Sequence, residues 1–410
     1  MADKRRVVVT GIGLRTPIGH SLAEMAEAFR QGRTGVRAMP EWRQIDHLRT
    51  AVAGVCEGVD ETAVPRHFRR AMGRVAVLAA LSATDALADA GIGEEAVASP
   101  RCGVSFGSTA GSSQAMEDYL RQIFASRSLK GLQSSVYIRF MSHTCAANLA
   151  TMFQVQGPVI ASCTACVAGS QGIGYGYEAI RSGRADVMIA GGAEEMHYMD
   201  AGIFDIMRAT STRYNDRPER TPRPFDRARD GLVVGEGGGC LVLEAYEHAR
   251  SRGAAIHAEI IGFGNNCDGG HITNPSAEGM AAAMRLALED AGIGAEDVGH
   301  VHAHATATEQ GDIAESRATH TVFGEGVPVS AIKGYMGHTL GACGAIESAV
   351  TILMLKEGFV VPTRNLDEPD PDCAPLNHVR GACRPHRFRI GMNNNFAFGG
   401  INTSLLFARV

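Results

Sequence analysis

A short sequence recurs in the two halves of this chain. The segment Ala88–Gly93 reads ADAGIG and Glu289–Gly294 reads EDAGIG, at an offset of 201 residues (289 − 88). In each copy a helical pattern stops at glycine, and a polar loop leads into an apolar strand. The leading strands also correspond, with VVVTGIG at Val7–Gly13 and AEIIGFG at Ala258–Gly264. Matching elements in one order predict an internally duplicated chain.

Strands alternate with helices in both halves of the sequence, which is typical of parallel sheets covered by helices. The expected halves are residues 1–250 and 251–410, and 410 residues are enough for two domain-sized units. The sequence therefore predicts an α/β fold made of two similar units.

Composition argues against several classes of protein. The net charge of −5, with both signs mixed, is not typical of a nucleic-acid-binding protein. The ten cysteines show no framework spacing, which favours a reducing compartment. Lys4–Arg6 leads directly into a strand without a signal-peptide cleavage site, and no apolar run approaches the roughly 18 residues of a membrane span. We expect a cytoplasmic protein without a nucleic-acid partner or a membrane span.

Cys166 is the first candidate for a reactive group. The segment Pro158–Gly183 reads as a buried strand at Val159–Ala161, a turn that holds Cys166, and a helix. A helix N-terminus favours a thiolate and would lower the pKa of the cysteine. The helix carries four glycines, each costing about 1 kcal/mol relative to alanine, which predicts close contact with neighbouring backbones. The alternative is an inert buried cysteine, which is the common fate of free cysteines.

Two histidines and a lysine are the other candidates. In VHAHATATEQGD, the alternation of a strand places His302 and His304 on one face, with His304 nearer the strand end. Aligning Arg181–Gly183 with Lys356–Gly358 places His338 near the entrance of the Cys166 helix, and Lys333 lies shortly before it. A neutral imidazole offers both a donor and an acceptor, so it can polarise a carbonyl or assist a thiolate.

Other interpretations of these residues were open. Val7–Gly13 resembles the start of a dinucleotide fingerprint, but Thr16 stands at the third glycine position. Zinc could bind His302 and His304 with a cysteine, but no further ligand stands at the right spacing. Cys163 and Cys166 form a C-x-x-C pair, although the chain lacks a compact redox domain. His302 and His271 could each be ordinary core residues.

Five motifs together carry a family resemblance over essentially the whole chain. They are TACVAGSQGIGYGYEAIRSGRADVMIAGGAEE, PFDRARDGLVVGEGGG, HATATEQGD, KGYMGHTLGACGAIES and NNNFAFGGIN. In this order and spacing they resemble the β-ketoacyl-acyl-carrier-protein synthases of the KAS II type. That resemblance implies a thiolase fold, which is an internally duplicated five-layered α-β-α-β-α arrangement.

The resemblance also implies roles for residues of this chain. Cys166 would be the acyl-accepting nucleophile, with His304, His338 and Lys333 as its catalytic partners. The backbone N–H groups of Cys166 and Phe398 would form the oxyanion hole, and Phe398 would gate the site. The residues implied in substrate binding are Thr306, Thr308, Ala110 and Phe396. Those implied in structural support are Glu347 and Asp312.

The implied reaction is a decarboxylative condensation. An acyl group held on Cys166 would be extended by two carbons with malonyl-acyl carrier protein, and the substrates would arrive on the phosphopantetheine arm of the carrier, without a metal or other cofactor. In the related families, the initiating KAS III type has a Cys-His-Asn set of catalytic residues. Thiolases carry a second catalytic cysteine in the C-terminal glycine motif. Two histidines and the cysteine-free motif Asn395–Gly400 favour elongation.

Several positions depart from the family pattern. Ala305 and Ala307 place methyl groups where they could crowd the pantetheine channel, and the hydroxyl common after the lysine is missing at Gly334. Ala110 replaces a bulkier residue at the end of the acyl pocket. We therefore hypothesise long, or rigid and unsaturated, acyl chains, as in a polyketide or aryl polyene pathway. The enzyme is expected to form a homodimer or to be the catalytic half of a heterodimer with a chain-length-factor-like subunit; the presence of Cys166 argues against a purely structural role.

Overall fold

The computed structural model describes residues 4–410. Within them, the longest sheet has 11 strands in the order β12-β10-β9-β14-β15-β8-β1-β7-β6-β4-β5. The strands from the first half are β1 (Val7–Arg15), β4 (Cys102–Gly107), β5 (Val159–Ile160), β6 (Val187–Glu194) and β7 (Gly237–Ala245). Those from the second half are β8 (Ala258–Cys267), β9 (His300–His302), β10 (Pro328–Ser330), β12 (Asn377–His378), β14 (Ile390–Ala397) and β15 (Ile401–Ala408).

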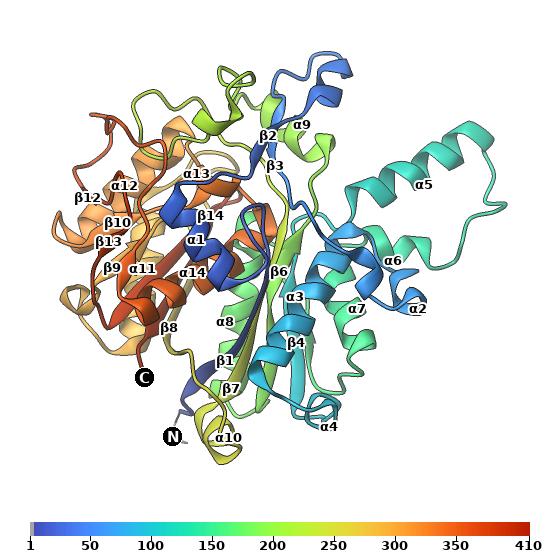
Figure 1. The fold of residues 1–410 in the computed structure, drawn as a ribbon, viewed down its shortest axis with the longest axis horizontal. Coiled ribbons are helices and arrows are strands. Elements are labelled where there is room, and N and C mark those ends of the chain that lie inside the picture. The colour runs from blue at the N-terminus through green and yellow to red at the C-terminus, as the bar shows by residue number, and fades with distance from the viewer. Residues whose placement is uncertain (1–3) are drawn as a thin grey trace.

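The strand order confirms the predicted duplication. β1 and β8 lie side by side at the centre of the sheet, and β7, β6, β4 and β5 follow on one side as β15, β14, β9 and β10 follow on the other. The two leading strands matched in the sequence are thus equivalent in the structure. In the ribbon, most of the second half, orange to red, lies to the left of the first half, while α1 (Leu22–Gln31) of the first half lies against α14 (Cys343–Glu357) (Figure 1).

The predicted parallel pairing holds for only part of the sheet, which is mixed. β4 is parallel to β5 and β6, but β7 is antiparallel to both β6 and β1. The end of β6 at Glu194 pairs with the start of β7 at Gly237, so the long connection between them returns to the sheet at the same end. A connection that does not cross the sheet makes its two strands antiparallel.

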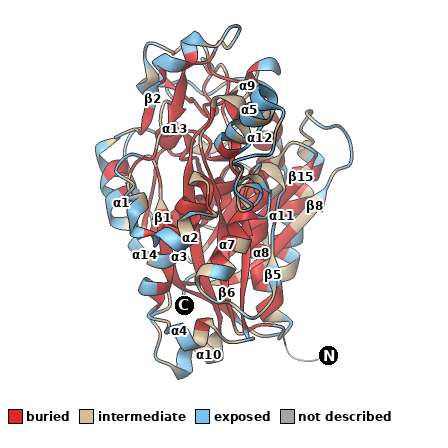
Figure 2. Cartoon of the chain, turned by 90° about the vertical axis from the view of Figure 1, so that its right-hand side faces the viewer, coloured by how far each residue is buried: buried red, intermediate tan, exposed pale blue. Residues whose placement is uncertain are grey.

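Helices form a central layer and two outer layers. α8 (Ala168–Arg181) and α14 (Cys343–Glu357) pack on each other and on strands of both halves. α3 (Arg74–Ala90) and α7 (Thr144–Met152) cover the outer face of the first half, and α11 (Ala277–Ala291) contacts β8 and β15 of the second half and packs with α12 (Glu309–Phe323). The sheet strands are buried along most of their length (Figure 2). The other helices of eight or more residues are α1 (Leu22–Gln31), α5 (Ser113–Ser126) and α9 (Tyr198–Ile206).

The glycines of α8 have the predicted function. A Cβ on Gly172 would lie 2.5 Å from the carbonyl oxygen of Gly191, and one on Gly169 would lie 2.7 Å from that of Gly341. No side chain fits at such distances, so glycine lets α8 approach β6 and the start of α14. The strand expected at Val159–Ala161 is shorter and less buried than predicted, because β5 is an edge strand and Val159 is 49% exposed.

Short elements complete the described chain. The short strands are β2 (Val36–Ala38), β3 (Val52–Gly54), β11 (Phe359–Val360) and β13 (Arg384–Pro385). The short α-helices are α2 (Arg66–Arg69), α4 (Glu94–Val97), α6 (Val136–Phe140), α10 (Tyr246–Ser251) and α13 (Lys333–Met336). Among residues 4–410, no helix has the length and apolar character needed to cross a membrane.

Candidate active site

Cys166 lies in a single 3-10 turn, Ala165–Val167, directly before α8. Its side chain is buried, and a hydrogen bond of 2.9 Å joins its Sγ to Nε2 of His338. His338 lies just before the 3-10 turn Leu340–Ala342 that leads into α14. The crossing of α8 and α14 therefore brings a nucleophile from one half of the chain against a base from the other.

The expectation of a lowered cysteine pKa was wrong. Burial raises the pKa of the Cys166 thiol to about 12, although the charge of Lys333 acts in the opposite direction. Loss of hydration disfavours the thiolate, and the charge of Lys333 does not offset it. The resting side chain is thus a thiol, and it needs a proton acceptor when it attacks.

His304 and His338 face each other edge to face, with ring centroids 5.1 Å apart. Both rings are buried, and burial together with the charge of Lys333 lowers their pKa values well below 6.5. Both imidazoles are therefore neutral at pH 7. The sulfur of Cys166 and one ring nitrogen from each histidine lie within 4.8 Å of one another, as the sequence predicted.

The side chain of Lys333 fixes the protonation of His304. Its Nζ lies 3.2 Å from Nδ1 of His304 and donates to the His304 carbonyl oxygen at 2.5 Å. Burial alone would lower the pKa of Lys333, but the hydrogen-bonded carboxylate of Glu347 raises it above its ordinary value. An ammonium group can only donate, so Nδ1 of His304 accepts and its single proton lies on Nε2.

This tautomer bears on metal binding. Cys166, His304 and His338 have ligand spacing, but a protonated Nε2 on His304 has no free lone pair for a metal ion. The nearby positive charge of Lys333 also repels cations. The three residues do not fit a resident metal. Cys163 of the C-x-x-C pair is a free, exposed thiol whose Sγ lies 3.2 Å from the carbonyl oxygen of Ser142.

The other predicted histidines lie elsewhere. β9 ends at His302, so His304 stands beyond the strand rather than on its face. His302 is a core residue, as one interpretation held, and its Nδ1 lies 2.9 Å from Oγ1 of Thr351. The same interpretation was wrong for His271, which is exposed on a loop at the cavity rim. Its Nδ1 accepts backbone N–H groups of Thr273 and Asn274, which fold the loop.

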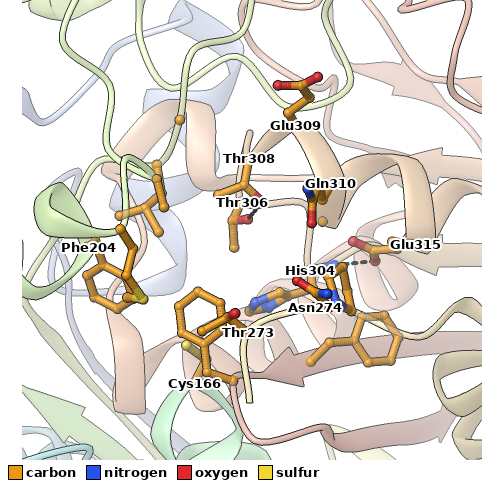
Figure 3. A pocket seen from close by; sticks show the side chains of 18 of the residues that line it. Cys166, Phe204, Thr273, Asn274, His304, Thr306, Thr308, Glu309, Gln310 and Glu315 are labelled. Carbon is orange, nitrogen blue, oxygen red and sulfur yellow. Dashed lines mark hydrogen bonds between the residues drawn. The ribbon is translucent and has the colours of Figure 1, made fainter. Parts of the chain in front are cut away.

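A cavity of about 740 Å³ opens onto Cys166, His304 and His338. Thr306 and Thr308 line it with hydroxyl oxygens 3.0 Å apart (Figure 3). Phe396 and Phe398 also line it, and the ring of Phe398 stacks on that of Phe204 at 5.7 Å. Three of the residues assigned to substrate binding, Thr306, Thr308 and Phe396, therefore line the same cavity as the predicted gate Phe398.

The expectation that Ala305 and Ala307 crowd this cavity was wrong, and the assignment of Ala110 stays a prediction. Ala305 and Ala307 do not line it; both are buried, and Ala305 belongs to the hydrophobic core of the second half. Both residues instead have positive φ values, 32° and 67°, a backbone conformation that glycine adopts more readily than alanine. Ala110 is exposed and lies away from this cavity, because it precedes α5 on the outside of the chain.

Two carboxylates hold the loop after β9 in place. Asp312 accepts the N–H groups of Ala307 at 3.0 Å and Phe225 at 2.6 Å, which supports its predicted structural assignment. Glu315, which the sequence did not reveal, accepts those of His304 at 2.7 Å and Ala305 at 2.6 Å. The sequence signal that could have identified Glu315 is its spacing, since residues three apart on a helix lie on the same face and Glu315 follows Asp312 by three.

Glu194, at the end of β6, was also missed. Its Oε2 accepts the N–H groups of Thr109 at 2.6 Å and of Gly341 at 3.1 Å, so it ties the His338 segment to the loop after β4. Burial, with a contribution from the charge of Asp200, raises its pKa from 4.5 to about 8.

Replacing Glu194 with glutamine is expected to flatten the pH dependence of stability. Between pH 4.5 and about 8 the folded protein keeps a proton on this carboxyl that the unfolded chain releases. Stability from this group is complete below pH 4.5 and is lost as the pH rises through about 8. Glutamine can still accept both N–H groups through its amide oxygen. Urea unfolding at several pH values would measure the slope, and an unchanged slope in Glu194→Gln would contradict the assignment.

Comparison with known proteins agrees with this geometry. Residues 4–249 match the family model for the β-ketoacyl synthase N-terminal domain, and residues 257–367 match that for the β-ketoacyl synthase C-terminal domain. This chain belongs to the β-ketoacyl synthases. It is 37% identical to 3-oxoacyl-[acyl-carrier-protein] synthase 2 of Vibrio cholerae over 420 aligned positions, covering 100% of both chains.

Solved structures place this β-ketoacyl synthase in the same fold. A crystal structure of a β-ketoacyl synthase from Burkholderia phymatum superposes with a TM-score of 0.96 at 49% identity, covering 99% of this chain and 100% of the other. The ishigamide ketosynthase/chain length factor superposes with a TM-score of 0.92 at 33% identity, again covering 99% and 100%. The predicted thiolase-type fold is confirmed.

Proposed function

We propose that this chain catalyses the condensation of an acyl group on Cys166 with malonyl-acyl carrier protein, giving a 3-oxoacyl chain two carbons longer. The observation that carries the proposal is the convergence of one thiol and two neutral imidazoles on the wall of a single cavity. The family assignment supplies the reaction class, and the side chains supply its steps.

The first step is acyl transfer to Cys166. As the thiol attacks the thioester carbonyl, its proton passes to Nε2 of His338, 2.9 Å away, and then to the departing phosphopantetheine sulfur. Among the described residues, Nδ1 of His338 has no hydrogen-bonding partner, so this ring can carry its single proton on either nitrogen. The backbone N–H groups of Cys166 and Phe398 would stabilise the oxyanion.

The second step is loss of CO2 from the malonyl group. The carbon–carbon bond to the carboxylate breaks, and its electron pair moves to the thioester oxygen as an enolate. The Nε2–H of His304, fixed by Lys333 at Nδ1, can donate to that oxygen, and His338 can join it in its Nε2–H tautomer. The enolate carbon then attacks the acyl thioester on Cys166, and the leaving thiolate takes up a proton from solvent to restore the resting thiol.

The carrier arm would enter along the threonine side of the cavity. Thr306 and Thr308 offer hydroxyl groups to the amides of phosphopantetheine, and Phe398 would move to admit the acyl group. At the rim, Arg227 and Arg229 are paired with Glu368 and Asp370. Arg208 is exposed at the same rim and can meet the phosphate of the arm.

Arg208→Glu is expected to raise the KM for carrier-bound substrates about 10-fold with little change in kcat, because it repels an anionic arm before the chemical step. Steady-state kinetics at two salt concentrations would measure this. Arg285→Glu on α11 is a matched control, since Arg285 is also exposed but does not line the cavity. Equal effects of both variants would show that Arg208 has no particular role.

The direct test of the function is reconstitution. The purified chain, acyl-carrier protein and malonyl-carrier protein are mixed, and mass spectrometry follows the acyl group on Cys166 and the carrier product. A 3-oxoacyl product two carbons longer, with release of CO2, is expected. Transfer without extension would contradict the proposal.

A second subunit is part of the proposed enzyme. α5 and the segment that follows it project from the body of the chain (Figure 1). They expose large apolar side chains, among them Phe124 at 73% and Leu129 at 70%. A second copy would cover them, giving the homodimer; the similarity to a ketosynthase/chain length factor pair supports the alternative of a related partner subunit. Size-exclusion of the chain alone distinguishes these, since a monomer would favour the heterodimer.

The acyl substrate of the proposed enzyme depends on that subunit. Ala110 lies on the exposed segment before α5, so it can meet an acyl chain only where a partner encloses it. We retain the hypothesis of long or unsaturated chains of a polyketide or aryl polyene pathway, carried out in the cytoplasm without a cofactor. The ten free cysteines support a reducing compartment. Equal extension rates for Ala110→Ile on long and short primers would count against the role of Ala110.

A further inference from the structure

Two asparagine side chains on β14 lie behind His304. Asn393 and Asn395 are fully buried and, being two residues apart on a strand, face the same side of the sheet. That side packs on α14, the helix that carries Glu347. A buried primary amide is costly unless its groups are bonded, so their partners define their function.

The contacts orient the amide of Asn395. Asn393 Nδ2 lies within hydrogen-bonding distance of Gly344 O (3.3 Å) and Ser348 Oγ (3.2 Å) on α14, and of Asn395 Oδ1 (3.1 Å). Because the oxygen of Asn395 faces that donor, its Nδ2 points the other way. It donates to Oε2 of Glu347 at 2.6 Å and lies 3.4 Å from Nδ1 of His304.

Asn395 and Lys333 contact the same two groups, the carboxylate of Glu347 and Nδ1 of His304. Lys333 binds Oε1 of Glu347 and Asn395 binds Oε2, so both carboxylate oxygens have a donor. The same two donors converge on Nδ1 of His304, at 3.2 and 3.4 Å. Nδ1 facing two donors cannot keep a proton, so the proton of this neutral ring is held on Nε2, toward the cavity.

We propose that Asn395 is a positioning residue for the decarboxylation step, which holds His304 as an Nε2–H donor and keeps Glu347 aimed at Lys333. This inference rests on the proposed function. Unlike Lys333, Asn395 adds no charge, so it strengthens the preference for one tautomer without raising the positive potential at the two imidazoles.

The test separates the two half-reactions. Acylation of Cys166 uses His338, whereas loss of CO2 uses the donor on His304. In Asn395→Ala, release of CO2 from malonyl-carrier protein is expected to fall about 10- to 100-fold, the effect of losing a hydrogen bond to a charged group. Acylation of Cys166, followed by intact-protein mass, is expected to stay within about 3-fold. Asn395→Asp should lower decarboxylation further, because it places a carboxylate against Glu347 and removes the donor.

Asn394→Ala is the matched control. Asn394 is equally buried and precedes Asn395 on β14, so it faces the other side of the sheet, where its Oδ1 accepts from Oγ of Ser404 at 2.7 Å. This variant should retain both half-reactions, and thermal unfolding of all variants would monitor the fold. If Asn395→Ala slows both half-reactions equally, or neither, the inference is overturned. If the wild-type chain neither acylates nor decarboxylates, the proposed function itself fails, which is a different result.

Discussion

Cys166→Ala is expected to lose condensation by about 10³-fold or more, while keeping part of its ability to release CO2 from malonyl-carrier protein. The nucleophile belongs only to the acyl transfer and the carbon–carbon bond-forming step. The Nε2–H donor of His304 is oriented by Lys333 and not by the sulfur. The ring of His338 loses only its hydrogen bond to Cys166 in this variant, so both imidazoles remain at the site. The variant should therefore uncouple decarboxylation from extension.

The measurement combines two assays. Intact-protein mass spectrometry should show no acyl adduct on Cys166→Ala, and CO2 release should continue without formation of a longer acyl chain. Cys163→Ala is the control, since this exposed thiol lies three residues earlier and does not line the cavity. An acyl adduct or product formation in Cys166→Ala at the wild-type rate would disprove the assignment of the nucleophile.

Glu347→Leu is expected to destabilise the fold by about 3–5 kcal/mol, because it leaves the ammonium group of Lys333 buried without a counter-charge. Both side chains of the pair are at most 2% exposed. In the double variant Lys333→Met, Glu347→Leu neither charge of the pair remains, and most of that stability should return. Condensation should nevertheless stay low, because His304 has lost the ammonium group of Lys333, whose Nζ lies 3.2 Å from Nδ1 of the imidazole.

Chemical denaturation and kinetics together test this pair. Stability that recovers without activity would show that the ion pair serves the histidine rather than the fold. If the double variant remains as unstable as Glu347→Leu, the pair is instead a packing requirement. If it recovers both stability and activity, Lys333 has no role in orienting His304.

Much of the fold was predictable because it depends on local patterns. The recurrence of ADAGIG marks the ends of α3 and α11, where Gly91 and Gly292 adopt the left-handed conformation that other residues avoid. The α8 glycines likewise indicated close packing before any contact was known. Strand direction was not predictable in this way, because it depends on whether the connection of residues 195–236 crosses the sheet.

The sequence predicted which residues form the site, but not their pKa values. Motif order indicated Cys166, His304 and His338, and the structure brings them together. The direction of the Cys166 pKa shift was wrong, because burial depends on residues from both halves of the chain. Ala305, Ala307 and His271 were misplaced for the same kind of reason, since exposure is a property of the folded molecule.

The amino-acid sequence by itself determined the duplication, the helix ends and the set of reactive side chains, because these follow from backbone conformation and residue chemistry over short distances. Only the tertiary structure decided which nitrogen of His304 carries its proton, that Asn395 and Glu315 support it, and that the thiol rests protonated. Both the hydrogen-bond partners of a side chain and its loss of hydration depend on contacts between distant segments. Cys166 and His338, for example, are 172 residues apart in the sequence.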